Sequence, residues 1–307
     1  MGDNKLLFEN AGEYVCLNGV IYETARYIKD NPDAGLWDAD VAYEVIRVDG
    51  GVPMFFEDHC ERLNNSLAKL HADSTVPTEA LAASAGLLLR VNGVSGGNIK
   101  IWAASCKQAP SALKAPPGRL TPTFNIFINV NRSYIPKAEY FETGAPAGLM
   151  PYTREDPNIK RYITGYKERV RELTEEGGFY EVLLYDAGRR LTEGSRSNLF
   201  FTIGGVIYTA PQDMILVGIR RKYVFAAAKG ADIEIVEKPV SLDELENGAA
   251  DGAFITGTGI GVLPISRIND ICLPSASNPI IRKIMGEYAK IEDNYKNVFS
   301  FTEGFSW

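Results

Sequence analysis

A polar stretch in the middle of the chain, NRSYIPKAEYFETGAP at residues 131–146, separates two segments with different patterns of strands and helices. It contains proline and glycine and has no apolar period, as segments between domains commonly do. With 307 residues, the chain is long enough for two hydrophobic cores. We therefore expect an α+β protein with a small N-terminal α+β domain over residues 1–128, a linker over 129–141 and a larger domain over 142–307.

The segment before the linker predicts strands and helices in alternation. Alternating apolar residues in VAYEVIRV predict a strand, Asp49-Gly50-Gly51 predicts a turn, and VPMFF predicts the returning strand. A helix is expected over EDHCERLNNSLAKL, and the spacing of Asp58 and Glu61 resembles a capping box at its start. The other expected elements are a helix over residues 78–91, strands over 97–105 and 123–130, and a proline-rich loop over 108–122.

The segment after the linker predicts a helix, then a series of short strands. The helix has an apolar stripe and ends at Gly177-Gly178, and the stripe comprises Ile163, Tyr166, Val170 and Leu173. The strands are expected in FYEVLLYD, RRLTEG, SNLFFTI and VIYTA, the last two joined by a hairpin at Gly204-Gly205. Two later pieces, MILVGIRR and FITGTGIG, place glycines after strands, where backbone N–H groups can bind an anion.

Charge and residue usage exclude several classes of function. The net charge is −7 and the basic residues are scattered, so we expect no nucleic-acid partner. No apolar run approaches the roughly 20 residues of a membrane helix, and the first residues do not resemble a signal peptide, so we expect a cytoplasmic protein with no membrane partner. Four isolated cysteines predict reduced thiols, and two histidines offer little material for a metal site or a Ser-His-Asp triad.

Five segments, in their order and content, carry a resemblance to a known family: FFEDHCERL, NIKRY, YEVLLYDAGRRLTEGSRSNLFF, MILVGIRR and FITGTGIGVLPI. The chain resembles the class IV aminotransferases, pyridoxal-phosphate enzymes that include D-amino-acid and branched-chain aminotransferases and aminodeoxychorismate lyase. The resemblance covers residues 36–265 and is most specific in LTEGSRSN. It implies the two-domain fold type IV architecture, with a β-barrel-like core and flanking helices in the larger domain. It also implies pyridoxal 5′-phosphate as cofactor and a homodimer with the active site at its interface.

Two residues match the catalytic groups of that family. Lys160 matches the Schiff-base lysine, which acts as nucleophile and then as proton carrier. Glu193 matches the carboxylate beside the pyridine nitrogen, where a negative charge keeps the nitrogen protonated and the ring electron-withdrawing. Taken alone, Lys160 would be a solvated lysine at a helix start and Glu193 an exposed turn carboxylate.

Seven further residues match cofactor contacts. Arg62 matches a guanidinium that binds the cofactor phosphate, although a surface helix arginine would look the same. Leu216 matches the residue that packs on the ring, although plain core packing explains it equally well. Asn198 is expected to fix a loop. The rest of the set supplies phosphate donors at a helix start and in a loop, namely Gly218, Ile219, Arg220 and Thr258.

The substrate residues are less completely matched. Tyr43 and Glu44 match the pair that borders the substrate pocket in D-amino-acid aminotransferases, and YEVIRV and TEGSRSN are nearest to that type. Those enzymes bind the substrate carboxylate with an Arg-x-His pair, but the best match here is Ser111-Ala112-Leu113. Arg196 is the expected replacement, with Lys100 and Lys107 as weaker ones.

The resemblance predicts a transaminase with a ping-pong mechanism. The favoured substrates are a D-amino acid and a 2-oxo acid such as 2-oxoglutarate or pyruvate. A branched-chain L-amino-acid aminotransferase and an aminodeoxychorismate lyase are the alternatives within the family. Gly165 stands where branched-chain enzymes have a tyrosine, which lowers the weight of the first alternative. A protein that binds the cofactor without turnover is the alternative of another class.

Overall fold

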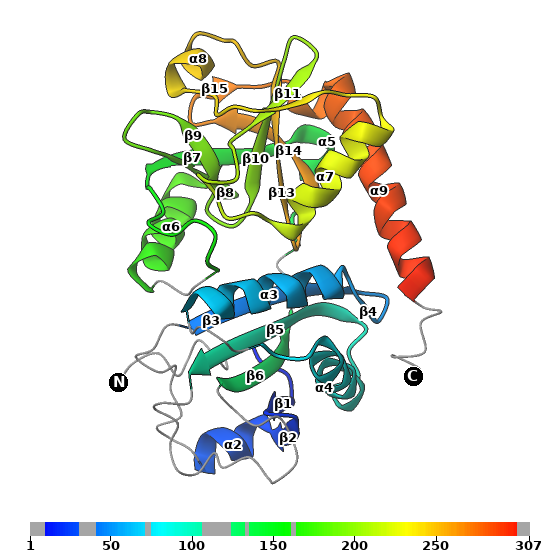
Figure 1. The fold of residues 1–307 in the computed structure, drawn as a ribbon. Coiled ribbons are helices and arrows are strands. Elements are labelled where there is room, and N and C mark those ends of the chain that lie inside the picture. The colour runs from blue at the N-terminus through cyan, green and yellow to red at the C-terminus, as the bar shows by residue number, and fades with distance from the viewer. Residues whose placement is uncertain are drawn as a thin grey trace. The chain divides into compact units, whose positions relative to one another are not determined.

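The computed structural model describes residues 10–30, 41–70, 75–105, 124–132, 135–160 and 164–299, which form two compact units (Figure 1). The first unit takes in Met1–Ser133, Ile159–Tyr162 and Tyr295–Trp307, and the second takes in Tyr134–Asn158 and Ile163–Asn294. The expected proline-rich loop over 108–122, together with Lys107 and Ser111-Ala112-Leu113, lies outside the described residues. So does Ile163 of the expected apolar stripe.

The first unit is built on one antiparallel sheet, with helices packed against it. The strand order is β2-β1-β6-β5-β3-β4. The strands are β1 (Tyr14–Leu17), β2 (Val20–Glu23), β3 (Val41–Asp49), β4 (Val52–Pro53), β5 (Gly96–Ser105) and β6 (Phe124–Asn131), and the helices are α2 (Thr24–Asp30), α3 (Phe56–Leu70) and α4 (Thr78–Val91). The predicted turn between β3 and β4 is confirmed, with positive φ at Gly50 and Gly51.

The start of α3 differs from the prediction. The helix begins at Phe56, two residues before Asp58, so the proposed capping box is wrong. The Phe56 N–H instead donates to the hydroxyl of Tyr295 at 3.0 Å, which satisfies one of the N–H groups that a helix leaves without an internal partner. A capping box is present elsewhere, in α8 (Leu242–Glu246), where Ser241 and Glu244 bond each other's backbone N–H groups.

The second unit contains a larger sheet, part of which closes on itself. Its order is β12-β11-β10-β13-β14-β7-β8-β9, and β9 also pairs with β10, so six of these strands form a ring. The strands are β7 (Ala145–Pro151), β8 (Glu181–Tyr185), β9 (Leu191–Gly194), β10 (Asn198–Ile203), β11 (Val206–Thr209), β12 (Ile235–Glu237), β13 (Gly252–Gly257), β14 (Gly261–Ile268) and β15 (Ile271–Cys272). The predicted hairpin at Gly204-Gly205 is confirmed.

Helices cover the second sheet because successive residues of its strands face two different cores. Phe201 packs in one core with Leu199 and Ile255, whereas Phe200 packs in another, beneath α7 (Ile219–Gly230) and α9 (Pro279–Phe299). A third cluster receives the stripe of α6 (Thr164–Gly177), namely Tyr166, Val170 and Leu173, as the sequence predicts. The remaining short helices are α5 (Tyr140–Thr143) and the 3-10 turn η3 (Ser275–Ser277).

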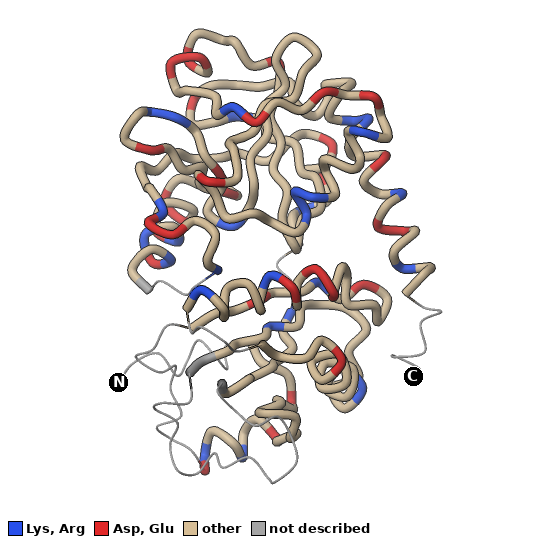
Figure 2. The backbone as a smooth tube through the Cα atoms, viewed as in Figure 1, with Lys and Arg blue, Asp and Glu red and all other residues tan. Residues whose placement is uncertain are grey.

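Acidic and basic residues are interspersed along the described backbone of both units (Figure 2). No helix among the described residues is both long enough and apolar enough to cross a membrane.

Candidate active site

Lys160 lies against strand β3 and helix α3 of the first unit. Its carbonyl accepts a hydrogen bond from the Tyr43 N–H at 3.1 Å, and its own N–H donates to the Ser66 hydroxyl at 3.4 Å. Its Nζ lies 5.0 Å from the centre of the Tyr43 ring. A solvated lysine at a helix start would not require these contacts. The structure therefore fixes the backbone of Lys160 at both polar groups and sets its amine over an aromatic face.

Tyr43 and Lys100 share one face of the first sheet. Tyr43 lies opposite Trp102 on β5, and their rings stack with centroids 5.4 Å apart. The next row on the same face joins Val45 on β3 to Lys100 on β5 and Asn129 on β6. The half-buried Lys100 is thus one row away from the ring that carries the Lys160 amine.

Glu44 lies on the opposite face from Tyr43, because side chains alternate along a strand. The expectation that the two side chains border one pocket is therefore wrong. The Glu44 carboxylate is fully buried beneath α3, where Oε1 accepts from Arg62 Nε and Oε2 from Arg62 Nη2, each at 2.7 Å. Oε2 also lies 2.8 Å from Nδ1 of the buried His59. Burial alone would raise the pKa of Glu44, but the Arg62 charge and the bonds from His59 and Arg62 hold that pKa well below its usual range.

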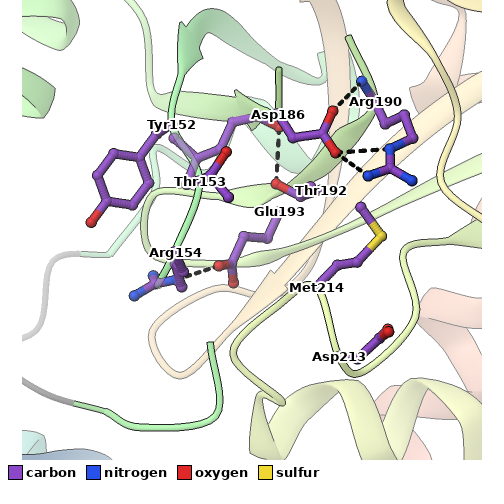
Figure 3. A pocket seen from close by; sticks show the side chains of 10 residues that line it. Tyr152, Thr153, Arg154, Asp186, Arg190, Thr192, Glu193, Asp213 and Met214 are labelled. Atoms are coloured by element: carbon purple, nitrogen blue, oxygen red, sulfur yellow. Dashed lines mark hydrogen bonds and ion pairs between the residues drawn. The ribbon is translucent and has the colours of Figure 1, made fainter. Parts of the chain in front are cut away.

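Glu193 forms the corresponding ion pair of the second unit, with Arg154 (Figure 3). Its Oε1 accepts from Arg154 Nε at 2.5 Å, and its Oε2 accepts from the Leu216 N–H at 3.2 Å. The residue is only 3% exposed, which is not the setting of a solvated turn carboxylate. A buried carboxylate with an arginine partner can remain ionised and accept a further N–H donor.

A cavity of ≈ 140 Å³ borders this ion pair. Figure 3 shows a second pair at the same cavity, in which Asp186 accepts from Arg190. Burial raises the pKa of Asp186 and its bonds from Arg190 lower it, with a net shift downward. The cavity lining comprises Tyr152, Thr153, Arg154, Leu184, Asp186, Arg190, Thr192, Glu193, Asp213 and Met214. Two ion pairs, Glu193 with Arg154 and Asp186 with Arg190, thus border one cavity.

The turn between Glu193 and Asn198 is folded around another buried carboxylate, that of Glu181. Ser195 and Ser197 both donate their hydroxyls to it, at 2.5 and 2.8 Å. A Cβ at Gly194 would lie 3.1 Å from the Glu181 carboxylate carbon, so the absence of a side chain there gives the turn room. The small residues of the motif EGSRSN are therefore explained by the carboxylate that they surround.

Arg196 points its guanidinium at the neighbouring strand rather than at the Glu193 carboxylate. Its Nη2 donates to the Tyr180 carbonyl at 2.7 Å, and its Nε lies 4.0 Å from Glu181. Half of the side-chain surface remains exposed. One of the five N–H groups of this guanidinium is therefore engaged by the Tyr180 backbone.

Asn198 fixes the loop that leads into α7. Its Nδ2 donates to the Leu216 carbonyl at 2.9 Å and its Oδ1 accepts from the Gly218 N–H at 3.1 Å. Gly218 is the N-cap of α7 and has no capping side chain, and a Cβ on it would collide with Asn198 Oδ1. Leu216 is half-buried, whereas its neighbour Ile215 is fully buried, so Leu216 is not an ordinary core residue.

The start of α7 exposes the backbone donors expected of a phosphate site. Ile219 and Arg220 are the first helical residues after Gly218, and the first N–H groups of a helix have no partner inside it. The Arg220 side chain is buried and directed elsewhere, to the Tyr288 hydroxyl at 2.9 Å, Glu292 at 2.5 Å and the Thr258 carbonyl at 3.5 Å. Arg220 thus links the helix start to the turn after β13 that carries Thr258, through its side chain rather than its N–H.

The residues of these clusters that were not expected from the sequence include His59, Arg154 and Glu181. The spacing of His59 and Arg62 could have placed both on one face of α3, since residues three apart on a helix are neighbours. The alternation of Ser195 and Ser197 could likewise have indicated a shared acceptor. No local pattern identifies Arg154 as the partner of Glu193.

The chemistry of these groups fits pyridoxal phosphate. The first unit offers a primary amine at Lys160 and an oriented guanidinium at Arg62. The second offers a buried carboxylate at Glu193 and the start of α7, whose N-cap, Gly218, has no capping side chain of its own. An amine, a carboxylate for a ring nitrogen and donors for a phosphate are what this cofactor requires.

Comparisons with known proteins agree with this chemistry. A D-alanine aminotransferase from Bacillus licheniformis is 28% identical over 272 residues, covering 88% of this chain and 94% of that protein. An aminodeoxychorismate lyase from Bacillus subtilis is 23% identical over 304 residues, covering 94% and 99%. The crystal structure of a branched-chain aminotransferase from Thermoproteus uzoniensis with norvaline has a TM-score of 0.72 and 25% identity, covering 96% of this chain and 97% of that one.

The fold expectation is confirmed by that structural similarity. The family model for amino-transferase class IV matches residues 41–268, which include both ion pairs, Lys160 and the start of α7. The chain therefore belongs to the class IV aminotransferases and has pyridoxal 5′-phosphate as its cofactor.

Proposed function

We propose that the chain is a D-amino-acid transaminase that moves an amino group from a D-amino acid to a 2-oxo acid such as 2-oxoglutarate or pyruvate. The observation that carries the amino-transfer chemistry is the setting of Lys160. Its backbone is bonded to β3 and α3, and its amine lies 5.0 Å from the centre of the Tyr43 ring. A fixed backbone limits the amine to positions that a short side-chain movement can reach, as a nucleophile and proton carrier requires.

The roles of the other residues follow from their chemistry. When bound, pyridoxal phosphate supplies an aldehyde that condenses with amines and a ring that withdraws electrons from the substrate. The Lys160 amine would hold the cofactor as a nucleophile and, once displaced by the substrate amine, would take the proton from Cα of the amino acid and deliver it to C4′ of the cofactor. Glu193 would accept a hydrogen bond from the ring nitrogen and favour its protonated form, and Leu216 would pack on the ring. Phosphate donors are the Arg62 guanidinium, the N–H groups of Ile219 and Arg220, and Thr258.

The substrate carboxylate needs a cation or several donors, because an unpaired charge is costly to desolvate. Two residues are proposed, Arg196 and Lys100. The Nη2 of Arg196 already donates to the Tyr180 carbonyl. Lys100 shares a sheet face with Tyr43, over whose ring the Lys160 amine lies. The location of Lys100 on the sheet face that carries the Lys160 amine supports Lys100 as the first candidate, in reverse of the order that the sequence suggests.

Replacement of each cation by alanine separates the two. The variant that removes the carboxylate partner should slow reaction with amino acids by about 10-fold to 100-fold, the scale of a hydrogen bond to a charged group, and spare amines that have no carboxylate. We expect this pattern for Lys100→Ala and little effect for Arg196→Ala. The reverse pattern would return the role to Arg196. Equal losses with both kinds of donor would assign it to neither.

The D-stereochemistry rests on similarity to D-alanine aminotransferase and on the motifs YEVIRV and TEGSRSN. Branched-chain L-amino-acid transamination and aminodeoxychorismate lysis stay as second candidates because of the similarities to the archaeal and Bacillus subtilis enzymes. Gly165 argues against the branched-chain type, since it stands where branched-chain enzymes have a tyrosine. A homodimer is also proposed, by analogy with the family.

A half-reaction panel tests the proposal. The absorbance of the bound cofactor would be followed after addition of D-alanine, D-glutamate, L-leucine or L-glutamate, and pyruvate release would be measured with aminodeoxychorismate. We expect D-glutamate to react about 100-fold faster than L-glutamate, which corresponds to about 2.7 kcal/mol of discrimination. Faster reaction with L-leucine or with aminodeoxychorismate would assign the corresponding alternative. A coloured protein inert to all donors would be a cofactor-binding protein without turnover.

A further inference from the structure

The buried cluster of Glu44, His59 and Arg62 has a feature that phosphate binding alone does not explain. A guanidinium attracts a phosphate most strongly when its charge is not neutralised, yet Arg62 is paired with a carboxylate that is fully buried. Removing two charges from water is costly, so a buried pair often adds little to stability compared with apolar side chains of similar volume, although breaking the pair is destabilising. Stability of the fold alone therefore does not explain why Arg62 is paired with Glu44.

The geometry of the pair indicates what it does. Glu44 binds Arg62 through two parallel bonds, from Nε and from Nη2, both 2.7 Å long. This fork fixes the plane of the guanidinium as well as its position.

The carboxylate is in turn held in place. His59 Nδ1 lies 2.8 Å from Glu44 Oε2, and His59 and Arg62 are three residues apart on the face of α3 that covers β3. Strand β3 places Glu44 between Val45 and Tyr43, the residue whose ring carries the Lys160 amine on the other face. The Glu44 carboxylate therefore connects helix α3, which carries Arg62, to strand β3, which lies beside Lys160.

We propose that Glu44 is a positioning residue, which orients Arg62 for the cofactor phosphate. The same pairing reduces the net positive charge at Arg62. The inference rests on the proposed phosphate role of Arg62. It has an unusual consequence for mutation. Removing a negative charge near an anion site should tighten anion binding by electrostatics alone. If orientation dominates, removing the Glu44 charge should weaken it.

The measured quantity is the contribution of the phosphate group to cofactor affinity. Dissociation constants of the apoprotein for pyridoxal 5′-phosphate and for pyridoxal, followed by absorbance and by tryptophan fluorescence, give a ratio in which the amine chemistry cancels. We expect Glu44→Gln to reduce this phosphate preference by about 10-fold or more, the scale of charge-assisted hydrogen bonds. Glu61→Gln is the matched control, because it removes one charge from the exposed side of the same helix. It should leave the preference unchanged or raise it slightly.

A second variant covers the case in which Glu44→Gln does not fold, as judged by circular dichroism. Glu44→Asp keeps the charge but withdraws the carboxylate by one methylene group. The orientation account predicts a reduced phosphate preference for it, whereas an account based on charge predicts none. An unchanged or increased preference in a folded Glu44 variant would overturn the inference.

Arg62→Met separates this inference from the proposed function. A folded Arg62→Met protein with an unchanged phosphate preference would show that Arg62 does not bind the phosphate, which would contradict the proposed function itself. Loss of the preference in Arg62→Met but not in the Glu44 variants would contradict only the positioning role.

Discussion

Each of the two units contains one buried arginine–glutamate pair, and we propose opposite uses for the two pairs. In the first unit the glutamate, Glu44, supports an arginine that we propose binds the cofactor phosphate. In the second unit the arginine, Arg154, supports a glutamate that we propose binds the ring nitrogen. The same two side chains can therefore prepare a site for an anion or for a cation.

The difference lies in what else holds the carboxylate. Both oxygens of Glu44 accept from side chains, Arg62 and His59, so this carboxylate is enclosed in a cluster beneath α3. Glu193 is bonded to Arg154 on one oxygen and to the Leu216 backbone on the other. Glu193 is thereby connected to the loop that leads into α7, which is the other part of the proposed cofactor site in that unit.

The largest expected effect comes from removing the Glu193 charge. Glu193→Gln keeps the size of the side chain but leaves the ring nitrogen largely unprotonated, so electron withdrawal from the substrate fails. We expect single-turnover proton abstraction to slow by about 1,000-fold, roughly 4 kcal/mol, with a much smaller change in cofactor affinity. A near-normal single-turnover rate would show that Glu193 does not have this role. It would also contradict the proposed opposite uses of the two arginine–glutamate pairs.

Loss of Arg154 should lower the free energy of unfolding. Arg154→Met leaves the buried Glu193 carboxylate without its partner, and an uncompensated buried charge costs about 3 kcal/mol or more. Urea unfolding of the apoprotein measures this change in the free energy of unfolding. Lys137→Met serves as the control, because its ion pair with Glu139 is exposed and worth little. Equal stability of the two variants would mean that the Arg154 contact is dispensable.

Acid should weaken the pair in the first unit. The pKa of Glu44 in the folded protein is lowered from its ordinary value of 4.5, with Arg62 and His59 facing the carboxylate. Its contribution to stability is therefore present above pH 4.5 and is lost as the pH falls through the folded pKa, and we expect it to be about 2 kcal/mol. Unfolding of the wild type and of Glu44→Gln would be compared from pH 7 to pH 3. A stability difference that stays constant over this range would contradict the assignment.

The smallest expected effect concerns the loop fixed by Asn198. A methyl group at Gly218 would collide with Asn198 Oδ1 and displace the N-cap of α7. We expect Gly218→Ala to weaken binding of pyridoxal 5′-phosphate by about 10-fold, the equivalent of one lost hydrogen bond. Gly286→Ala is the control, since a Cβ there would meet no atom within 4 Å and the position is an exposed helix residue. Similar affinity in both variants would show that the loop tolerates displacement.

Much of the fold follows from local sequence patterns. Alternation in residues 41–48, the turn at Gly50 and Gly51, and the stripe on α6 all produced the predicted elements. The start of α3 was mispredicted because Asp58 and Glu61 satisfy the capping-box spacing without being at the helix end. Local spacing cannot show that the Tyr295 hydroxyl, far along the chain, receives the first N–H group.

The candidate site was predictable only in part, because its contacts join residues distant in sequence. Motifs pointed to Lys160, Glu193 and Arg62, which carry recognisable chemistry. Their supporting partners are separated from them by 18 residues for Glu44 and Arg62 and by 39 for Arg154 and Glu193. The alternation of side chains along β3 also places Tyr43 and Glu44 on opposite faces, which excludes the shared pocket that the resemblance implied for this pair.

The central claim, that Lys160 is the lysine that binds pyridoxal 5′-phosphate, has a direct test. The purified protein with its cofactor would be reduced with borohydride, digested, and analysed by mass spectrometry for the lysine that carries the pyridoxyl group. The account predicts modification of the peptide containing Lys160, and loss of this modification in Lys160→Ala while non-covalent cofactor binding persists. A pyridoxyl group on another lysine, such as Lys167 or Lys222, would contradict it.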